Sequence, residues 1–370
     1  MWAGIVCVLL SVFSVQAVES RTDSILPVRG LSIGTPSGKG LDGFLRFIEE
    51  ELAPAQFNLL ILRVDWGYAY ETHPELRSEN PLSRAEVKKI VAVCKKHGIT
   101  VVPQINLLGH QSWAKTTGNL LRVYPEFDET PHVKTEDYPG WPNPDGLYCK
   151  SYCPLHPGIH KIIFALVDEL TDVFETSLFH AGMDEVFYIG DEHCPRCGGI
   201  DKAELFAGEV TALRNHLSLQ GKRLMIWGDR LIDGKVTGIG GWEASMNNTH
   251  RAIDLIPKDV FICDWHYDRA DKTPVYFAVK GLDVAICPWR KAPVALQELD
   301  DMLRFRKSAT AEMKSHFRGI IATVWSGNET FLKNYYETPV DATAESEAVT
   351  LKKLMEAFRE ISGSFQKSRP

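Results

Sequence analysis

The sequence has no excess of positive charge and no compositional bias. Its 370 residues include 41 lysines and arginines against 48 aspartates and glutamates, a formal net charge of −7. Proteins that bind nucleic acid or anionic lipid through charge carry clustered Lys and Arg, so we expect neither as a partner. Hydrophobic residues make up 44% and charged residues 24%. This composition is typical of a folded globular protein and excludes a mainly disordered chain.

Long apolar segments are also missing, except at the N-terminus. Residues Ile5–Val15 form an apolar run that is shorter than the roughly 20 residues of a membrane-spanning helix. Val15-Gln16-Ala17 follows with small residues where a signal peptidase cleaves. We predict a signal peptide over residues 1–17 and a secreted or periplasmic mature chain, residues 18–370, without an integral membrane span. A membrane anchor is the alternative, because no Lys or Arg precedes the run.

Cysteines are few, and four of them form two close pairs. The chain has eight, and Cys7 lies in the predicted signal peptide, so an odd number remains and at least one thiol is expected to be unlinked. The pairs are Cys149 with Cys153 and Cys194 with Cys197. They are compatible with one four-cysteine structural zinc site, with two disulfides or with unlinked thiols. None of these interpretations places a cysteine in the chemistry.

Short apolar runs alternate with longer amphipathic segments along the predicted mature chain. This order is typical of parallel strands joined by helices, and eight strands close a (β/α)8 barrel. We therefore predict an α/β fold, a single TIM barrel. The predicted strands are Val28–Ile33, Asn58–Asp65, Thr100–Asn106, Leu178–Met183, Arg223–Gly228, Val260–Trp265, Asp283–Pro288 and Gly319–Trp325. The predicted helices are Leu41–Leu52, Arg84–Lys96, Ile159–Phe174, Lys202–Leu219, Leu296–Ser315 and Glu345–Ile361.

Aromatic and acidic residues gather at the carboxyl ends of the predicted strands. In (β/α)8 barrels this end holds the active site. Flat aromatic faces among carboxylates suit a carbohydrate, because a pyranose offers apolar C–H faces for stacking and hydroxyls for hydrogen bonding. We therefore expect a carbohydrate as the partner. The residues at these ends are Asp65, His110, Asp184, Glu185, Trp227, Trp265, Tyr267, Trp289 and Trp325.

One motif is specific. His180-Ala-Gly-Met-Asp184-Glu185 ends the fourth predicted strand and resembles the His-x-Gly-x-Asp-Glu signature of glycoside hydrolase family 20, the β-N-acetylhexosaminidases. Leu155-His156-Pro157 and the segment from Pro103 to His110 are similar to the family's segments upstream of that signature. The resemblance covers most of residues 28–330. It implies a glycosidase that removes terminal N-acetylglucosamine or N-acetylgalactosamine and needs no cofactor.

The resemblance implies roles for four residues. Glu185 is the general acid that protonates the leaving oxygen and later the base that activates water. Asp184 orients the substrate's 2-acetamido group, whose carbonyl oxygen attacks C1, so the reaction is substrate-assisted and retaining. Asp65 and His110 match the partners behind the acid. Adjacent residues of a strand point to opposite faces, so we expect the chain to turn just past the strand end.

The walls of the site match the family less closely. Trp227, Trp265 and Trp325 match tryptophans that enclose the acetamido group, and Arg29 resembles an arginine that binds ring hydroxyls. The seventh predicted strand ends at Trp289, where the family usually has a tyrosine for the acetamido carbonyl, and Tyr267 is the candidate replacement. These departures concern the recognition of hydroxyls, and hence the preference for gluco or galacto sugars.

Three other functions are compatible with these residues. A non-catalytic carbohydrate-binding barrel is one, although this sequence keeps both Asp184 and Glu185. A glycosidase of different sugar specificity is another, with Asp229 or Asp264 as the nucleophile of a double displacement. The third is a metal-dependent hydrolase, although the sequence has no HxH or HExxH pair. Its ligands would be His110, His180, Asp184 and Asp229.

Overall fold

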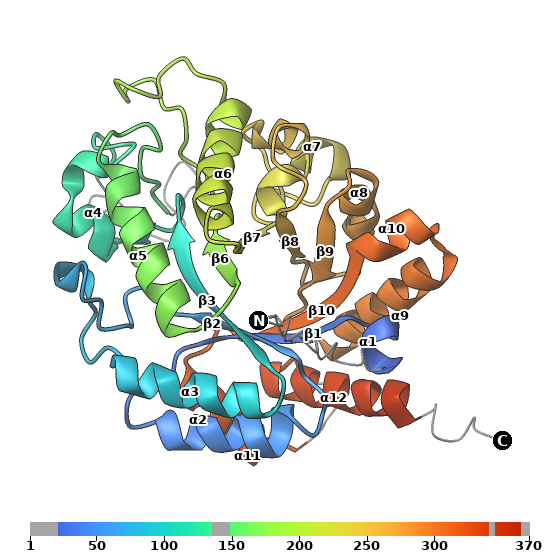
Figure 1. The fold of residues 1–370 in the computed structure, drawn as a ribbon. Helices are drawn as coiled ribbons and strands as arrows, with labels where there is room; N and C mark the ends of the chain where they lie inside the picture. The colour runs from blue at the N-terminus through green and yellow to red at the C-terminus, as the bar shows by residue number, and fades with distance from the viewer. Residues whose placement is uncertain (1–20, 135–148, 340–344, 364–370) are drawn as a thin grey trace, which may run out of the picture.

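The computed structural model describes residues 21–134, 149–339 and 345–363. The predicted signal peptide, residues 1–17, lies outside the described residues. Within them, eight parallel strands close into a barrel in the order β1-β10-β9-β8-β7-β6-β3-β2. Helices surround the strands as an outer layer (Figure 1). The predicted (β/α)8 barrel is therefore confirmed.

Each predicted strand corresponds to one barrel strand, with ends that shift by at most two residues. Nearly all strand residues are buried, because parallel strands are covered by helices on one face and by the barrel interior on the other. A short antiparallel pair, β4 (Ser112–Trp113) and β5 (Thr116–Thr117), follows β3. The barrel strands are β1 (Val28–Gly34), β2 (Leu59–Arg63), β3 (Thr100–Leu107), β6 (Leu178–Gly182), β7 (Arg223–Trp227), β8 (Phe261–Asp264), β9 (Asp283–Ile286) and β10 (Phe317–Thr323).

The helices follow the prediction with one correction. The segment predicted as one helix, Leu296–Ser315, is two, because the Thr310 side chain accepts a hydrogen bond from the Met313 N–H and caps a new helix. Short helices such as α8 (Thr273–Val279) and α11 (Asn328–Glu337) are absent from the prediction. The helices are α1 (Arg21–Ile25), α2 (Leu41–Phe47, continued by a π-helical turn, Ile48–Leu52), α3 (Arg84–Lys96), α4 (Asn119–Val123), α5 (Ile159–Val173), α6 (Lys202–Ser218), α7 (Gly234–Thr237), α8 (Thr273–Val279), α9 (Ala292–Ser308), α10 (Ala311–His316), α11 (Asn328–Glu337) and α12 (Glu347–Gly363). The 3-10 turns are Pro74–Leu76, Pro125–Phe127, Asp229–Leu231 and Thr249–Asp254.

The core has two layers, which follow from the alternation of side chains along each strand. On β2, Leu59 and Ile61 point into the barrel interior, where they belong to one apolar cluster. Leu60 and Leu62 belong to the second cluster, between the barrel and its helices. The interior cluster ends in aromatic side chains at the carboxyl ends of the strands, and it forms the base on which the site described below is built.

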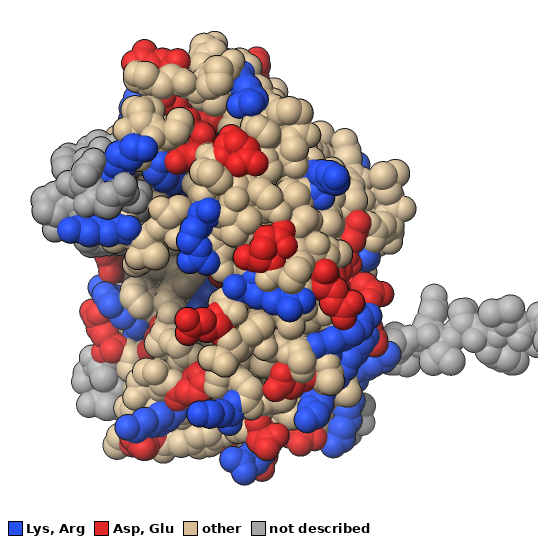
Figure 2. Space-filling view, turned by 90° about the vertical axis from the view of Figure 1, so that its left-hand side faces the viewer, with Lys and Arg blue, Asp and Glu red and all other residues tan. Residues whose placement is uncertain are grey.

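The surface agrees with the near balance of charges in the sequence. Acidic and basic side chains are interspersed on the face shown in Figure 2, where no extended basic area forms. In the part of the chain that the structure describes, every helix is too short or too polar to cross a membrane.

Candidate active site

A cavity of about 390 Å³ opens at the carboxyl ends of the barrel strands. Its volume lies in the usual range for small-molecule sites, and aromatic rings with a few polar groups are the usual lining. Every lining residue except Trp113 belongs to the set predicted from the sequence. The lining residues are His110, Trp113, Asp184, Glu185, Trp265, Tyr267, Trp289 and Trp325.

The two adjacent carboxylates reach the same cavity because the chain turns after β6. Gly182, Met183 and Glu185 have φ angles of 66°, 67° and 49°, a left-handed conformation that is uncommon for residues other than glycine. Such backbone strain is concentrated at functional sites. Asp184 and Glu185 are each only 7% exposed. The predicted turn past the strand end is present.

His110 lies between the two carboxylates. Its Nε2 is 3.0 Å from Asp184 Oδ2 and 3.1 Å from Glu185 Oε2. The other oxygen of Asp184, Oδ1, is buried without a hydrogen-bond partner. The approach depends on Gly109, because a Cβ at this position would lie 2.7 Å from the Asp184 carbonyl oxygen. The connection after β3 is thereby held directly against the turn after β6.

The imidazole and the aspartate form a buried ion pair. Burial lowers the pKa of His110, but the charges and hydrogen bonds of its neighbours, Asp184 foremost, outweigh burial and raise that pKa well above its ordinary value. Burial raises the pKa of Asp184, but the charge and hydrogen bond of His110 bring it below its ordinary value. Both groups are therefore charged at neutral pH.

Asp65 lies behind this pair rather than in the lining of the cavity. Its Oδ1 accepts a hydrogen bond of 2.8 Å from the Asn106 N–H, and its φ of 42° turns the chain at the end of β2. Burial raises the pKa of Asp65, while the nearby charge of His110 acts in the opposite direction. Asp65 therefore contributes to the electrostatic surroundings of His110.

Tyr267 is at the centre of the aromatic wall. Its ring centroid lies 4.9 Å from that of Trp265 and 5.2 Å from that of Trp289. Its hydroxyl oxygen accepts a hydrogen bond of 2.8 Å from the Trp325 Nε1–H. Glu347, on α12, holds the Trp289 side chain and the Trp325 backbone, because its Oε1 accepts hydrogen bonds from the Trp289 indole and the Trp325 backbone N–H. The sequence did not predict this role.

Trp113 stands at the mouth of the cavity. It belongs to β4, is 56% exposed, and stacks on His110 with a centroid distance of 6.0 Å and an interplanar angle of 18°. An exposed ring beside the two carboxylates offers a flat apolar surface on which a ligand can stack.

Residues 65–336 match the model of glycosyl hydrolase family 20, catalytic domain. The chain belongs to this family. It is 24% identical over 249 residues to a β-hexosaminidase of Vibrio furnissii, an alignment that covers 66% of this chain and 34% of the relative. It is 30% identical over 176 residues to a β-hexosaminidase of Akkermansia muciniphila, covering 41% of this chain and 33% of the relative. The chain thus covers about a third of the length of each.

Solved structures share the fold of this family 20 barrel. A crystal structure of a β-N-acetylhexosaminidase has a TM-score of 0.64 at 18% identity and covers 92% of this chain and 76% of its own. The structure of an exo β-N-acetylglucosaminidase of Vibrio harveyi in complex with N-acetylglucosamine has a TM-score of 0.59 at 15% identity. The match covers 91% of this chain and 58% of that one. The family and the fold that the sequence motif predicts are both confirmed.

Two further carboxylates of the family 20 barrel face protein groups. Asp229 Oδ2 accepts hydrogen bonds from the Glu185 N–H at 2.9 Å and from Arg230 Nε at 2.6 Å, and its Oδ1 accepts one from the Trp265 indole at 3.1 Å. Burial raises the pKa of Asp229 to about 6. Asp264 Oδ2 accepts a hydrogen bond from Thr273. Neither carboxylate lines the cavity, so neither can reach a substrate there as a nucleophile. Asp229 instead positions Glu185 and Trp265.

Arg29 does not lie at the site, and its assignment to sugar binding is corrected. It is near the amino end of β1, where its guanidinium donates hydrogen bonds to the Leu26 and Gln56 carbonyl oxygens and to Asp23. Arg63, at the carboxyl end of β2, does not line the cavity either, but it packs on a ring that does. Its guanidinium carbon is 4.4 Å from the centroid of the Trp325 ring, and its Nη1 is buried without a hydrogen-bond partner.

Trp227 lies beneath the cavity, fully buried, and is absent from its lining. Its ring centroid is 4.7 Å from that of His180 and 5.8 Å from that of Trp325. His180 Nδ1 accepts a hydrogen bond from the Gly182 N–H. The metal-hydrolase alternative needs His110, His180, Asp184 and Asp229 as ligands of one ion. Among the described residues, neither His180 nor Asp229 belongs to a group of side chains close enough to share a metal ion.

The described cysteines are all unlinked thiols. Cys149 lies at the active site, where its thiol donates a hydrogen bond of 3.3 Å to the Glu185 carbonyl oxygen. Cys153, Cys194 and Cys197 gather elsewhere, and Glu129 joins them. Of the three interpretations left open for the cysteine pairs, the zinc site made by all four cysteines does not fit the structure, because Cys149 contacts the turn that carries Glu185 and lies outside the group.

Proposed function

We propose that this chain hydrolyses terminal N-acetylhexosaminides with retention, using the substrate's own acetamido group as the nucleophile. One observation carries the proposal: Asp184 and Glu185 face one aromatic cavity, and Asp184 Oδ1 is buried without a partner. An acceptor in that state costs free energy unless a ligand N–H occupies it. The curated relatives with matching segments are named β-hexosaminidases.

In the first step the acetamido carbonyl oxygen attacks C1. Asp184 Oδ1 accepts the acetamido N–H, which orients the group and stabilises the positive charge that develops on it. Glu185 gives its proton to the glycosidic oxygen as the C1–O bond breaks, so the aglycone leaves as a neutral alcohol. The product is a cyclic oxazolinium ion, and His110 is within hydrogen-bond distance of the Glu185 carboxylate that this step creates.

In the second step Glu185 takes a proton from water, which attacks C1 and opens the ring. The sugar is released with its original anomeric configuration, because C1 has been displaced twice. Tyr267 supports both steps. Its hydroxyl oxygen accepts the Trp325 indole N–H and lies beside Thr323, and we assign its proton to the acetamido oxygen of the bound substrate.

The experiment compares three p-nitrophenyl β-glycosides: N-acetylglucosaminide, N-acetylgalactosaminide and plain glucoside. We expect turnover of one or both acetamido substrates and none of the glucoside. A thiazoline analogue of the oxazolinium ion should inhibit far more strongly than N-acetylglucosamine, because it resembles a species near the transition state. Hydrolysis of the glucoside, with covalent labelling of Asp229 or Asp264 by a 2-deoxy-2-fluoro glycoside, would establish an ordinary double displacement. No turnover with retained sugar binding would establish the binding barrel.

The proposal includes export. Its support is the short apolar run Ile5–Val15 followed by small residues. Expression of the full chain in a secreting host should release a protein whose N-terminus is Val18. A protein that stays in the cell with its first residues intact would contradict export without affecting the proposed chemistry.

A further inference from the structure

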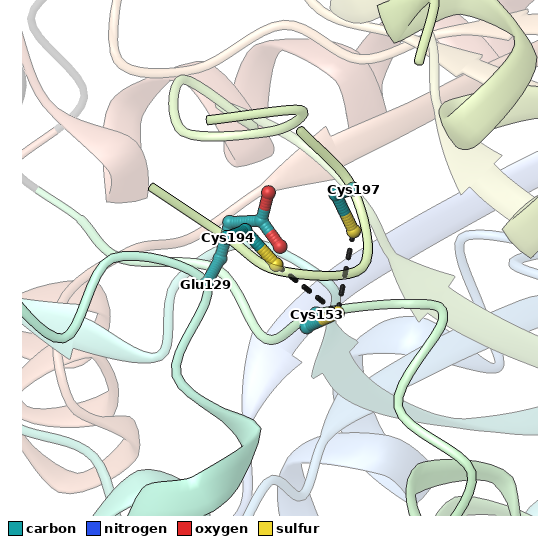
Figure 3. A group of neighbouring side chains, drawn as sticks. All are labelled: Glu129, Cys153, Cys194 and Cys197. Atoms are coloured by element: carbon teal, nitrogen blue, oxygen red, sulfur yellow. Dashed lines mark hydrogen bonds between the residues drawn. The ribbon is translucent and has the colours of Figure 1, made fainter. Parts of the chain in front are cut away.

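Three thiols and one carboxylate converge outside the active site. Cys153, Cys194, Cys197 and Glu129 are each at most 3% exposed, and one potential ligand atom of each lies within 4.8 Å of the others. Figure 3 shows the four side chains pointing toward one another. Glu129 and Cys153 come from the connection between β3 and α5, while Cys194 and Cys197 come from the loop between β6 and α6.

The distances between the sulfur atoms match a shared metal ion better than a disulfide. Cys153 Sγ lies 3.3 Å from Cys197 Sγ and 3.6 Å from Cys194 Sγ, whereas a disulfide has an S–S length of about 2.05 Å. Thiolates at about 2.3 Å from a tetrahedral Zn²⁺ are separated by about 3.8 Å. Both observed distances lie within about 0.5 Å of that separation. A disulfide would join only two of the three thiols and leave the third without a partner, whereas one metal ion binds all three.

Glu129 supplies the independent evidence. Its Oε1 accepts a hydrogen bond of 3.1 Å from the Asp191 N–H, and its Oε2 is buried without a hydrogen-bond partner. Among the described residues, the cations of these loops pair with other carboxylates: Lys150 with Asp128, and His193 with Asp191. A buried carboxyl group is neutralised by a proton, by an ion pair or by a metal ion, and a cation at the centre of the thiols would satisfy Oε2 and the three sulfur atoms together.

The backbone around the cysteines is shaped for metal binding. In Cys194-Pro-Arg-Cys197-Gly198, the Gly198 N–H donates a hydrogen bond to the Cys194 carbonyl oxygen. A Cβ on Gly198 would lie 2.9 Å from that oxygen, so the tight turn requires glycine. The turn directs both thiols of the pair to the same side, toward Cys153.

The geometry points to a structural Zn²⁺ site formed by Cys153, Cys194, Cys197 and the Oε2 atom of Glu129. Thiolates select zinc over magnesium or calcium, and a closed set of four protein ligands is typical of a structural rather than a catalytic zinc. The ion would fasten the connection that carries His110 to the loop that follows Glu185. This site is independent of the proposed glycosidase activity.

The direct test is the metal content of the full chain, purified without chelator and analysed by inductively coupled plasma mass spectrometry. We expect about one zinc per chain, the stoichiometry of a single closed site, and loss of zinc in Cys153→Ala and in Glu129→Gln. Cys94→Ala is the matched control, because Cys94 is buried in α3 away from the group, and it should keep its zinc. Chelation should lower the melting temperature of the wild type and leave that of a folded Cys153→Ala unchanged.

A second measurement does not depend on the variants folding. Wild-type protein loaded with Co²⁺ should show the intense visible bands of tetrahedral cobalt and a thiolate-to-cobalt charge-transfer band in the near ultraviolet. Wild-type protein that holds neither metal and whose seven described thiols all react after unfolding would overturn the site. So would mass-spectrometric detection of a disulfide between Cys153 and Cys197 in the native protein.

Discussion

His110 and Asp184 form a buried ion pair that also touches the proposed general acid. The same Nε2 atom lies 3.0 Å from Asp184 Oδ2 and 3.1 Å from Glu185 Oε2. One N–H is therefore shared between the carboxylate that orients the substrate and the carboxylate that exchanges a proton with it. The charge state of His110 links the two proposed roles.

Replacing Glu185 with Gln removes the proton donor and leaves the shape of the side chain. We expect turnover of alkyl glycosides, which have poor leaving groups, to fall by about 10² to 10⁴, the usual contribution of a positioned acid. Dinitrophenyl glycosides should be affected much less in the first step, because their leaving group needs no proton. Glu192→Gln, an exposed position on the same loop, serves as the control. Equal losses on both substrate classes would remove Glu185 from the acid role.

Replacing Asp184 with Asn removes the charge that keeps His110 protonated. Burial then meets less opposition, and the pKa of His110 should fall, although Glu185 still raises it. In the wild type the folded-state pKa exceeds the unfolded one, so protonation of His110 stabilises the fold below about pH 6.5 and this contribution is lost as pH rises through the folded value. Titration of the imidazole ¹⁵N chemical shifts measures the pKa of His110 in the wild type and in Asp184→Asn. An unchanged midpoint in Asp184→Asn would refute the ion pair.

Trp113 should matter for the second sugar rather than for the first. Removing its ring in Trp113→Ala costs about 0.5 to 1.5 kcal/mol of stacking, so we expect KM for a chitobiose-type disaccharide to rise about 2- to 12-fold. The inhibition constant of the thiazoline, which has no aglycone, should stay the same. Trp242→Ala is matched in exposure, at 41%, and lies outside the cavity. If Trp113→Ala weakened the thiazoline as much as the disaccharide, the ring would belong to the acetamido site instead.

Replacing Arg63 should change the kinetics, whereas replacing Arg29 should change the stability of the fold. Arg63→Met removes the guanidinium held over the Trp325 ring, a contact that contributes about 0.5 to 2 kcal/mol, so kcat/KM should fall about 2- to 30-fold as Trp325 loses its support. Arg29→Met leaves carbonyl oxygens without donors and should lower the free energy of unfolding by about 1 to 3 kcal/mol, with KM unchanged. Michaelis–Menten kinetics and urea unfolding on both variants test this. The reverse pattern would restore the assignment of Arg29 to the sugar.

The strands and most of the cavity could be predicted because both follow from local patterns. Buried parallel strands appear as continuous apolar runs, and the barrel rule places chemistry at their carboxyl ends. That rule found His110, Asp184, Glu185 and the wall formed by Trp265 and Tyr267. Applied strictly, it would also have favoured Arg63, near the carboxyl end of a predicted strand, over Arg29, near the amino end of another.

The remaining residues depend on long-range packing that no local pattern encodes. Glu347 begins a helix more than twenty residues after Trp325 and returns to it only because α12 packs against α9 and β10. Glu129 lies in a long connection whose path the apolar pattern does not specify. Trp227 resembles the other strand-end tryptophans in sequence, and only the packing of the barrel interior shows that it lies below the cavity.

The central claim is that the substrate's acetamido oxygen is the nucleophile. Aryl N-acylglucosaminides with zero, one, two or three fluorine atoms on the acetyl methyl provide the most direct measurement, because each fluorine weakens that oxygen as a nucleophile and changes the size of the group little. We predict that kcat/KM falls steeply with each added fluorine, following the mechanism in which Asp184 orients the amide. Values of kcat/KM that stay level across the series would contradict the account.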